Sequence, residues 1–435
     1  MRTVDLRLDP EVIVPIEPAG ALAGHALVVD RGCIVAVVPT ELAERDYAPR
    51  THVALPGKVL LPGLVNAHTH AAMTLFRGIA DDVALKVWLE REIWPREGKH
   101  VGPEFVYDGA RLAAVEMLKG GTTCFHDMYF YPDATAKACL ETGIRAVLGL
   151  PVLDFPTSYA SDPDQYLSVG LAVRDAYKAS PRLAFTLAPH APYTVGDATF
   201  DKIVMFARQL DLPITTHVSE SAVEVAASIE QYGITPLARL HKLGVTGPGF
   251  IGVHGVHLSS SDIELLATHG GHIVHCPVSN MKLGSGIAPI PALLAHGVNV
   301  AIGTDGAASN NRQDGWSEMR IAALLAKVGS GDPAVWPAQK VLESATLGGA
   351  RALGLDARVG SLVPGKSADM VAVDLAATSS LPCYDPLSHL VHVAGRESVT
   401  DVWIDGERVV EDRRLLNVAE ADIAARARAW QERLR

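Results

Sequence analysis

Several features that would define other protein classes are missing from this sequence. Its five cysteines are odd in number and form no CxxC pair, so we expect reduced thiols rather than a disulfide framework. The most apolar windows are about ten residues long, short of the roughly 20 needed to span a bilayer. The N-terminal MRTVDLRLDP contains acidic residues and no continuous apolar segment, which argues against a secretory signal. We therefore expect a soluble, cytoplasmic protein.

Runs of basic residues are also missing. The net charge is −11 and no Lys/Arg-rich segment occurs, so neither nucleic acid nor an anionic membrane surface is an expected partner. Hydrophobic residues make up 48% and charged residues 20%, which is typical of a well-packed globular protein. The 435 residues are too many for one small core and fit a barrel of about 250 residues or more with a smaller accessory domain.

The chain divides into three zones. Residues 1–60 contain short β-branched runs such as HALVVDRG and CIVAVVP, a pattern that predicts a small antiparallel sheet. Residues 61–358 alternate apolar strand-like runs with helical stretches, and residues 359–435 return to short strands before a charged terminal helix. We expect the first and third zones to pair into one discontinuous domain.

The middle zone predicts a parallel (β/α)8 barrel, with a doubly wound sheet as the alternative. Its eight expected strands are LLPGLVNAH, TTCFHDM, IRAVLGLP, LAFTLAPH, PITTHV, FIGVHG, HIVHCP and NVAIGTD. Candidate catalytic or metal-binding residues follow the first, fourth, fifth, sixth and eighth of these runs. A closed barrel explains this better, because the carboxyl ends of its strands share one face.

Histidines at these strand ends predict a metal site. His68 and His70 are two residues apart at the end of the first run, so both imidazoles point to one side. His217 and Asp305 end the fifth and eighth runs. Three imidazoles and one carboxylate leave room for a catalytic water on a divalent ion. Other histidines have ordinary structural interpretations, namely His25, His52, His100, His126, His241, His269, His296, His389 and His392.

Nearby groups could move protons. Glu220 follows His217 by three residues and could collect a proton from water and deliver it to a substrate nitrogen, although a solvated carboxylate at a helix N-terminus is the alternative. Asp305 could accept a proton as well as bind the metal, and His254 could polarise the attacked centre. The fourth run, LAFTLAPHAPYT, lacks a lysine that could bridge two ions, so we expect one metal and assign His190 to substrate.

These motifs resemble the amidohydrolase superfamily in its mononuclear aminohydrolase/chlorohydrolase branch, and most closely the 5′-methylthioadenosine/S-adenosylhomocysteine deaminases. The resemblance rests on PGLVNAHTH, APHAPYT, THVSES, GVHGVHL, PVSNMKLGSGIAPI and GTDGAASNN, and it extends along essentially the whole chain. It implies a β-sandwich built from both termini and homo-oligomers. It also implies metal ligands at His68, His70, His217 and Asp305, normally zinc and sometimes iron.

The resemblance further implies roles for the remaining site residues. Glu97, in WPRE, and His190 would contact the substrate, and Glu97 could accept both ribose hydroxyls, with a solvated helix residue as the alternative. Glu220, His254 and Asp305 would face the purine ring, with Glu220 as the proton shuttle.

One departure affects the expected substrate. Family members that act well on S-adenosylhomocysteine are expected to hold its carboxylate with arginines after the third strand. Here that segment reads GLPVLDFPTSYASDPD, with Leu150 in place of one arginine and no other until Arg174, while Arg145 is interpreted as structural. A charge-assisted contact of roughly 1.5–3 kcal/mol would be lost. We therefore predict deamination of 5′-methylthioadenosine, with adenosine and S-adenosylhomocysteine as weaker substrates.

Two other functions stay open at this point. A deaminase of a free base such as guanine, or a chlorohydrolase of a triazine, would use the same metal ligands. A metal-free scaffold that serves protein interaction is an alternative from another class, and the intact ligand set together with Glu220 argues against it.

Overall fold

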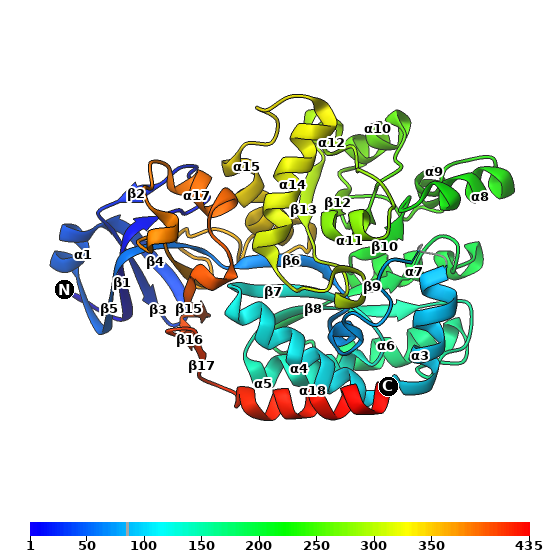
Figure 1. Ribbon diagram of the computed structural model, residues 1–435, viewed down its shortest axis with the longest axis horizontal. Helices are drawn as coiled ribbons and strands as arrows, with labels where there is room; N and C mark the ends of the chain where they lie inside the picture. The colour runs from blue at the N-terminus through cyan, green and yellow to red at the C-terminus, as the bar shows by residue number, and fades with distance from the viewer. Residues whose placement is uncertain (84–86) are drawn as a thin grey trace.

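The computed structural model describes residues 1–83 and 87–435. They form two β-sheets with surrounding helices, and the two sheets lie side by side along the long axis of the molecule (Figure 1). One is an eight-stranded parallel sheet from the middle of the chain, and the other is a nine-stranded mixed sheet that draws on both ends. Within the described part, no helix combines the length and the apolar character needed to cross a bilayer.

The eight-stranded sheet is the predicted barrel. Its strands follow one another in chain order and every neighbouring pair is parallel. The ring closes where the backbone amides of Thr304 and Asp305 donate to the carbonyl of His68, at 3.1 and 3.0 Å. The strands are β6 (Leu64–Thr69), β7 (Thr122–Met128), β8 (Arg145–Val152), β9 (Leu183–Pro189), β10 (Ile214–Val218), β11 (Phe250–His254), β12 (His272–His275) and β13 (Asn299–Ile302).

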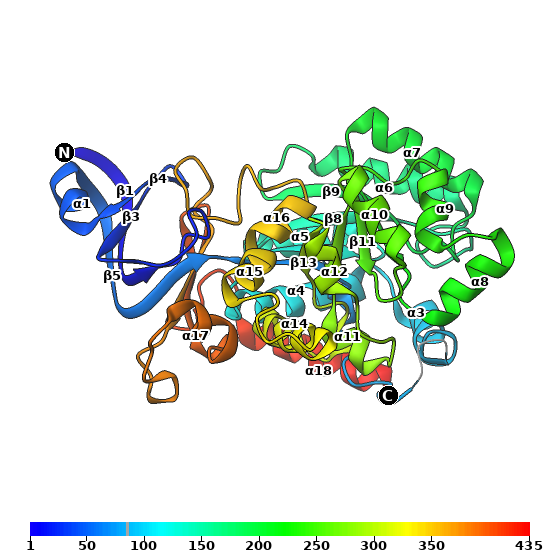
Figure 2. The ribbon, with the colours of Figure 1, turned by 90° about the horizontal axis from the view of Figure 1, so that it is seen from above.

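Helices surround the barrel and connect its strands (Figure 2). The segment between β6 and β7 contains η1 (Ala71–Phe76), η2 (Trp88–Ile93), α3 (Trp94–His100) and α4 (Pro103–Lys119). The next connections contain α5 (Pro132–Thr142), α6 (Pro163–Tyr177), α7 (Asp197–Leu210), α8 (Ala222–Tyr232), α9 (Pro236–Lys242), α10 (Ser260–His269), α11 (Pro277–Lys282) and α12 (Ile290–Ala295). After β13 come α13 (Ala307–Asn310), α14 (Gly315–Ser330), α15 (Ala338–Glu343), η3 (Ser344–Gly348) and α16 (Gly349–Ala352).

The barrel strands are apolar on both sides because both sides are covered. Leu148 and Phe185 belong to the large core that packs against the helices, whereas Val147 and Val253 belong to a separate cluster inside the ring. Such continuous apolar runs are typical of parallel strands, whose connecting helices exclude water from the outer surface. Of the polar residues in these strands, His68, His217 and His254 lie at or next to the carboxyl ends.

The second sheet is built from the predicted first and third zones. Its order is β17-β16-β15-β14-β5-β1-β3-β4, with β2 paired to β1. Its strands are β1 (Arg2–Ile13), β2 (Leu22–Ala23), β3 (His25–Asp30), β4 (Cys33–Pro39), β5 (Tyr47–Pro62), β14 (Met370–Asp374), β15 (Val399–Ile404), β16 (Glu407–Glu411) and β17 (Arg414–Leu415). Helix α1 (Thr40–Asp46) connects β4 to β5. The remaining pieces are η4 (Thr378–Ser380), α17 (Pro386–His392), η5 (Arg396–Ser398) and α18 (Glu420–Leu434).

Two details of this sheet differ from the sequence analysis. The sheet is mixed rather than antiparallel, because the long strands β1 and β5 pair in parallel over most of their length. The predicted strand LLPGLVNAH is also divided at Gly63, where β5 ends and β6 begins. A Cβ at Gly63 would lie 2.1–2.6 Å from side-chain atoms of Thr123, so glycine lets the chain pass closely from one sheet to the other.

Buried ion pairs join the two sheets. Arg145, at the start of β8, donates to Asp369 at 2.9 and 3.1 Å and to Asp405 at 2.7 Å, which confirms that this arginine is structural. The terminal helix α18 returns to the barrel, where Trp430 donates to Asp108 of α4 at 2.8 Å. The division of the chain at residues 60/61 and 358/359 into separate domains stays a prediction.

Candidate active site

The predicted site residues meet at one end of the barrel. His68 lies in β6, His217 in β10 and His254 at the end of β11. His70 and His190 directly follow their strands, and Asp305 lies three residues beyond β13. All of them except His68 line a cavity of about 250 Å³, together with Glu97 and Glu220. That volume suits a single small molecule rather than a polymer.

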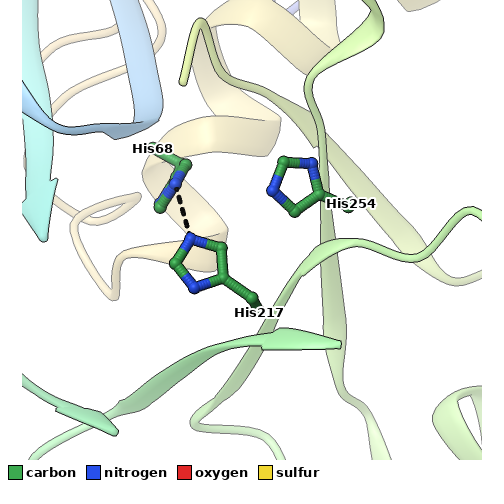
Figure 3. A group of neighbouring side chains, drawn as sticks. All are labelled: His68, His217 and His254. Atoms are coloured by element: carbon green, nitrogen blue, oxygen red, sulfur yellow. Dashed lines mark hydrogen bonds between the residues drawn. The ribbon is translucent and has the colours of Figure 1, made fainter. Parts of the chain in front are cut away.

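The four predicted metal ligands are close together. Asp305 Oδ1 lies 3.2 Å from His70 Nε2 and 3.5 Å from His68 Nε2. His217 Nε2 lies 3.3 Å from His68 Nε2, as the dashed line in Figure 3 shows. Two groups with metal-binding geometry result, one of His68, His70 and Asp305 and one of His68, His217 and His254. His68 is common to both, so the second group brings His254 to the edge of the same centre (Figure 3).

Hydrogen bonds fix the tautomers of two ligands. His70 Nδ1 donates to the Met128 carbonyl and His217 Nδ1 donates to the His190 carbonyl, each at 2.6 Å. In the neutral form of each ring, Nε2 therefore keeps its lone pair, which faces other acceptors, including the Asp305 carboxylate. Nitrogen and oxygen lone pairs that converge in this way repel one another unless a cation lies between them. The donor set consequently fits a divalent metal ion held by three imidazoles and a carboxylate.

Two serines that the sequence analysis missed hold Asp305. The hydroxyls of Ser279 and Ser309 donate to Asp305 Oδ2 at 2.6 and 2.7 Å, and the Gly306 amide donates to Oδ1 at 2.8 Å. Asp305 itself has a positive φ of 60°. Both serines lie in motifs already singled out, PVSNMK and GAASN, and only folding brings them together.

A buried glutamate links the helices that carry these serines. Glu318 of α14 accepts from the side chain of Asn310, in α13, at 2.6 Å and from the backbone amide of Val278, in α11, at 3.3 Å. Burial raises the pKa of Glu318 to about 8. Because Ser279 lies in α11 and Ser309 in α13, Glu318 fixes the spacing of the two hydroxyls on Asp305.

Glu220 occupies a tight turn between β10 and α8. The side chain of Glu224 accepts from the backbone amides of Ser219 and Glu220, each at 2.8 Å, and Ser221 caps the helix through the Glu224 amide. These bonds hold the Glu220 side chain in the cavity wall, where it is 6% exposed. Burial raises the pKa of its carboxyl, which suits a group that alternates between holding and releasing a proton.

His254 faces Glu220 across the cavity floor. Its Nε2 lies 3.9 Å from Glu220 Oε2, and its Nδ1 lies 2.8 Å from Asn280 Oδ1. With Nδ1 donating to that oxygen, Nε2 keeps a lone pair toward the cavity. Asn280 is a second residue that sequence reasoning missed, and it adjoins Ser279 in α11.

The remaining predicted contacts lie along the cavity wall. Glu97 accepts from the hydroxyl of Tyr129 at 2.7 Å, and burial raises the pKa of its carboxyl. His190 Nδ1 lies 3.0 Å from the Thr194 hydroxyl, and burial, with the neighbouring imidazoles, lowers the pKa of His190 to about 3. His190 is therefore neutral near pH 7. Tyr129 is a further contact missing from the sequence analysis.

The wall after β8 is mostly apolar, with Thr157 and Ser158 as its polar members, and Leu150 does not contribute to it. The Leu150 side chain packs outward against Gly170 of α6, so it does not replace a substrate-facing arginine directly. Leu153, Phe155 and Pro156 line the cavity instead. No lysine or arginine is present among the described residues that line it.

The other histidines keep structural interpretations where the structure shows partners. His126 is buried in β7 with Nε2 at 2.8 Å from the Thr186 hydroxyl. His25, His52, His241, His296 and His389 make hydrogen bonds to nearby backbone or side-chain atoms outside the cavity.

Comparisons with known proteins identify the family of this chain. Residues 59–409 match the model of the amidohydrolase family. The chain is 45% identical over 433 residues to the 5-methylthioadenosine/S-adenosylhomocysteine deaminase of Teredinibacter turnerae, covering 99% of this chain and 98% of the relative. It is 40% identical, with the same coverage, to the 5′-deoxyadenosine deaminase of Methanosarcina acetivorans.

Solved structures show the same fold. An adenosine deaminase from Xanthomonas campestris with bound zinc superposes with a TM-score of 0.98 at 48% identity, covering 100% of this chain and 99% of that one. The atrazine chlorohydrolase TrzN of Arthrobacter aurescens, complexed with zinc, gives a TM-score of 0.91 at 25% identity, covering 98% and 99%. The barrel and the match over most of the sequence lead to one conclusion: the chain belongs to the amidohydrolase family.

Proposed function

We propose that the protein hydrolytically deaminates an adenine nucleoside, with 5′-methylthioadenosine as the preferred substrate and 5′-methylthioinosine and ammonia as products. S-adenosylhomocysteine and adenosine would be weaker substrates. The observation that carries this proposal is the placement of Glu220 3.9 Å from His254 in the cavity that His70, His217 and Asp305 also line. The full-length similarity to a 5-methylthioadenosine/S-adenosylhomocysteine deaminase and to a 5′-deoxyadenosine deaminase supports it.

The proposed metal ligands are His68, His70, His217 and Asp305, which would hold one Zn²⁺ per subunit, with Fe²⁺ as the alternative. Three nitrogen ligands and one oxygen ligand accept either ion, and zinc is bound in the similar adenosine deaminase structure. When bound, such an ion supplies an activated water near neutral pH by lowering its pKa.

The protein groups would move protons around C6 of the purine. Asp305 accepts a proton from the attacking water, and His254 Nε2 positions that water. Glu220 delivers a proton to N1 as the C–O bond forms at C6 and the N1=C6 double bond opens. Collapse of the tetrahedral carbon then breaks the bond to the exocyclic nitrogen, which gains the proton held by Asp305 and leaves as ammonia, while the C6 hydroxyl proton returns to Glu220. The raised pKa of Glu220 matches this donor role near neutral pH.

The nucleoside would be held by Glu97 and His190. The Glu97 carboxylate, oriented by Tyr129, accepts from the two ribose hydroxyls, and neutral His190 contacts the base. The apolar wall of Leu153, Phe155 and Pro156 suits a methylthio group.

We further propose a cytoplasmic homo-oligomer that acts on small molecules and binds neither nucleic acid nor membranes.

The test is a comparison of kcat/KM for methylthioadenosine, S-adenosylhomocysteine, adenosine and guanine with zinc-loaded protein. We expect methylthioadenosine to lead. In Glu97→Ala we expect kcat/KM for nucleosides to fall about a hundredfold or more, because two charge-assisted hydrogen bonds are lost. Guanine lacks ribose and would be unaffected. Glu41→Ala, an exposed change on α1, is the matched control. Inactivity toward every adenine nucleoside would refute the proposal and favour a free base or a chlorinated triazine.

A further inference from the structure

The cavity changes in character between its floor and its mouth. The imidazoles and most of the carboxylates described above are buried or half-buried, whereas the exposed aromatic lining residues Trp94, Phe155 and Tyr193 mark the mouth. Trp94 and Phe155 form a pair there. The two rings are 6.1 Å apart between centroids, with an interplanar angle of 58°. They are 36% and 37% exposed, although large aromatic side chains are usually mostly buried. Such an exposed aromatic pair at the opening of a cavity is positioned to contact a ligand.

The shape of an adenine nucleoside places its 5′ end at this pair, and this step depends on the proposed function. The C6 amino group and the ribose are at opposite ends of the nucleoside. With C6 at the metal ligands, the ribose and its 5′ substituent therefore extend toward the mouth. Glu97, the proposed ribose contact, is three residues after Trp94 in α3, so the two side chains lie on the same face of the helix. A group on the 5′ carbon then lies next to Trp94 and Phe155.

The charges of the side chains that line the cavity determine which 5′ substituents it can accept. The described lining residues contain the carboxylates of Glu97, Glu220 and Asp305 and no lysine or arginine. A substituent that ends in a carboxylate would be desolvated without a cationic partner and would also approach Glu97. A thioether has no charge to desolvate, and sulfur packs favourably against aromatic rings at about 5 Å.

We propose that Trp94 and Phe155 are specificity-determining residues that form an aromatic slot for a neutral 5′ substituent. The substrate class is adenosines with a 5′-alkylthio or 5′-arylthio group, including groups longer than methyl, because the partly exposed rings leave the outer end of the slot open. The zwitterionic amino-acid end of S-adenosylhomocysteine is selected against.

The experiment measures kcat/KM for adenosine, 5′-methylthioadenosine, 5′-butylthioadenosine and S-adenosylhomocysteine. In the wild type we expect the two alkylthio substrates to lie within about tenfold of each other and above the other two. In Trp94→Ala, both alkylthio substrates should lose about tenfold relative to adenosine, which has little to place in the slot. Phe155→Leu, which keeps an apolar side chain, should lose less.

A charge placed in the slot provides the sharpest comparison. Phe155→Arg should raise the ratio of S-adenosylhomocysteine to methylthioadenosine by about tenfold to a hundredfold, because a guanidinium pairs with the carboxylate. Leu140→Arg adds the same charge at an exposed position on α5, away from the cavity, and should leave the ratio unchanged.

The outcomes distinguish a failure of the slot proposal from a failure of the proposed function. Equal losses for all four substrates in Trp94→Ala, or an unchanged ratio in Phe155→Arg, would overturn the slot while deamination itself stands. A wild-type preference for S-adenosylhomocysteine would overturn it as well. If the wild type deaminates none of the four substrates, the proposed function is refuted, and the proposal of the slot, which rests on it, is refuted with it.

Discussion

The hydroxyls of Ser279 and Ser309 provide a direct test of how the metal centre is held. Both donate to Asp305 Oδ2, which leaves Oδ1 facing His68 and His70. A hydrogen bond to a charged group contributes about 1.5–3 kcal/mol, and about 1.4 kcal/mol corresponds to a tenfold change in an equilibrium constant. Replacing either serine by alanine should therefore weaken zinc binding about tenfold to a hundredfold, the range observed for partners of metal ligands.

The assay is competition for zinc between the purified protein and a chromophoric chelator, which reports affinity independently of turnover. Ser279→Ala and Ser309→Ala are each compared with Ser330→Ala, whose hydroxyl donates to a backbone carbonyl at the end of α14. The double variant should bind more weakly than either single variant, because Oδ2 then has neither hydroxyl donor. Wild-type zinc affinity in the double variant would refute the idea that these serines orient Asp305.

Three further predictions follow from buried groups. Glu220→Gln should keep its zinc but lose about a hundredfold or more in kcat, measured with methylthioadenosine, and a wild-type rate would exclude Glu220 as the proton shuttle. Arg145→Met should lower the free energy of unfolding by about 3–5 kcal/mol in a denaturant titration, because Asp369 and Asp405 keep their charges without the shared guanidinium; a change below about 1 kcal/mol would contradict this. Burial raises the pKa of Glu318 from 4.5 to about 8, so the folded state binds this proton more tightly and stability should fall as pH rises through that interval. Glu318→Gln cannot ionise there and should show a shallower fall in Tm with pH, whereas an identical slope would contradict the raised pKa.

The barrel could be predicted from sequence because its signals are local. Each strand is a short apolar run, and His68, His217 and Asp305 end or follow such runs, so the rule that strand ends share one face was enough to bring them together. The eight predicted strands are confirmed, with the first shortened at Gly63.

The supporting contacts could not be predicted in the same way. Ser279 and Ser309 reach Asp305 only because α11 and α13 pack side by side. Tyr129 directly follows β7 and is separated from Glu97 in the sequence by α4, so only folding brings these two side chains together. The parallel pairing of β1 with β5 is also invisible to a local pattern, since two strands of alternating residues fit either direction. The orientation of Leu150 was likewise not predicted. Adjacent residues of a strand point to opposite sides, and the Leu150 side chain lies on the side away from the cavity.

The division of one sheet between both ends of the chain has a consequence for synthesis on the ribosome. The end of strand β5, residues 58–62, is covered along one edge by β14, which begins roughly 300 residues later. At about 5–20 residues per second, that edge stays open for tens of seconds while the barrel is being made. A long strand with unpaired amides and carbonyls is a template for pairing with other chains. The nascent protein therefore exposes an aggregation-prone edge until Met370–Asp374 emerges, and release of a chain that stops before these residues would leave that edge permanently unprotected.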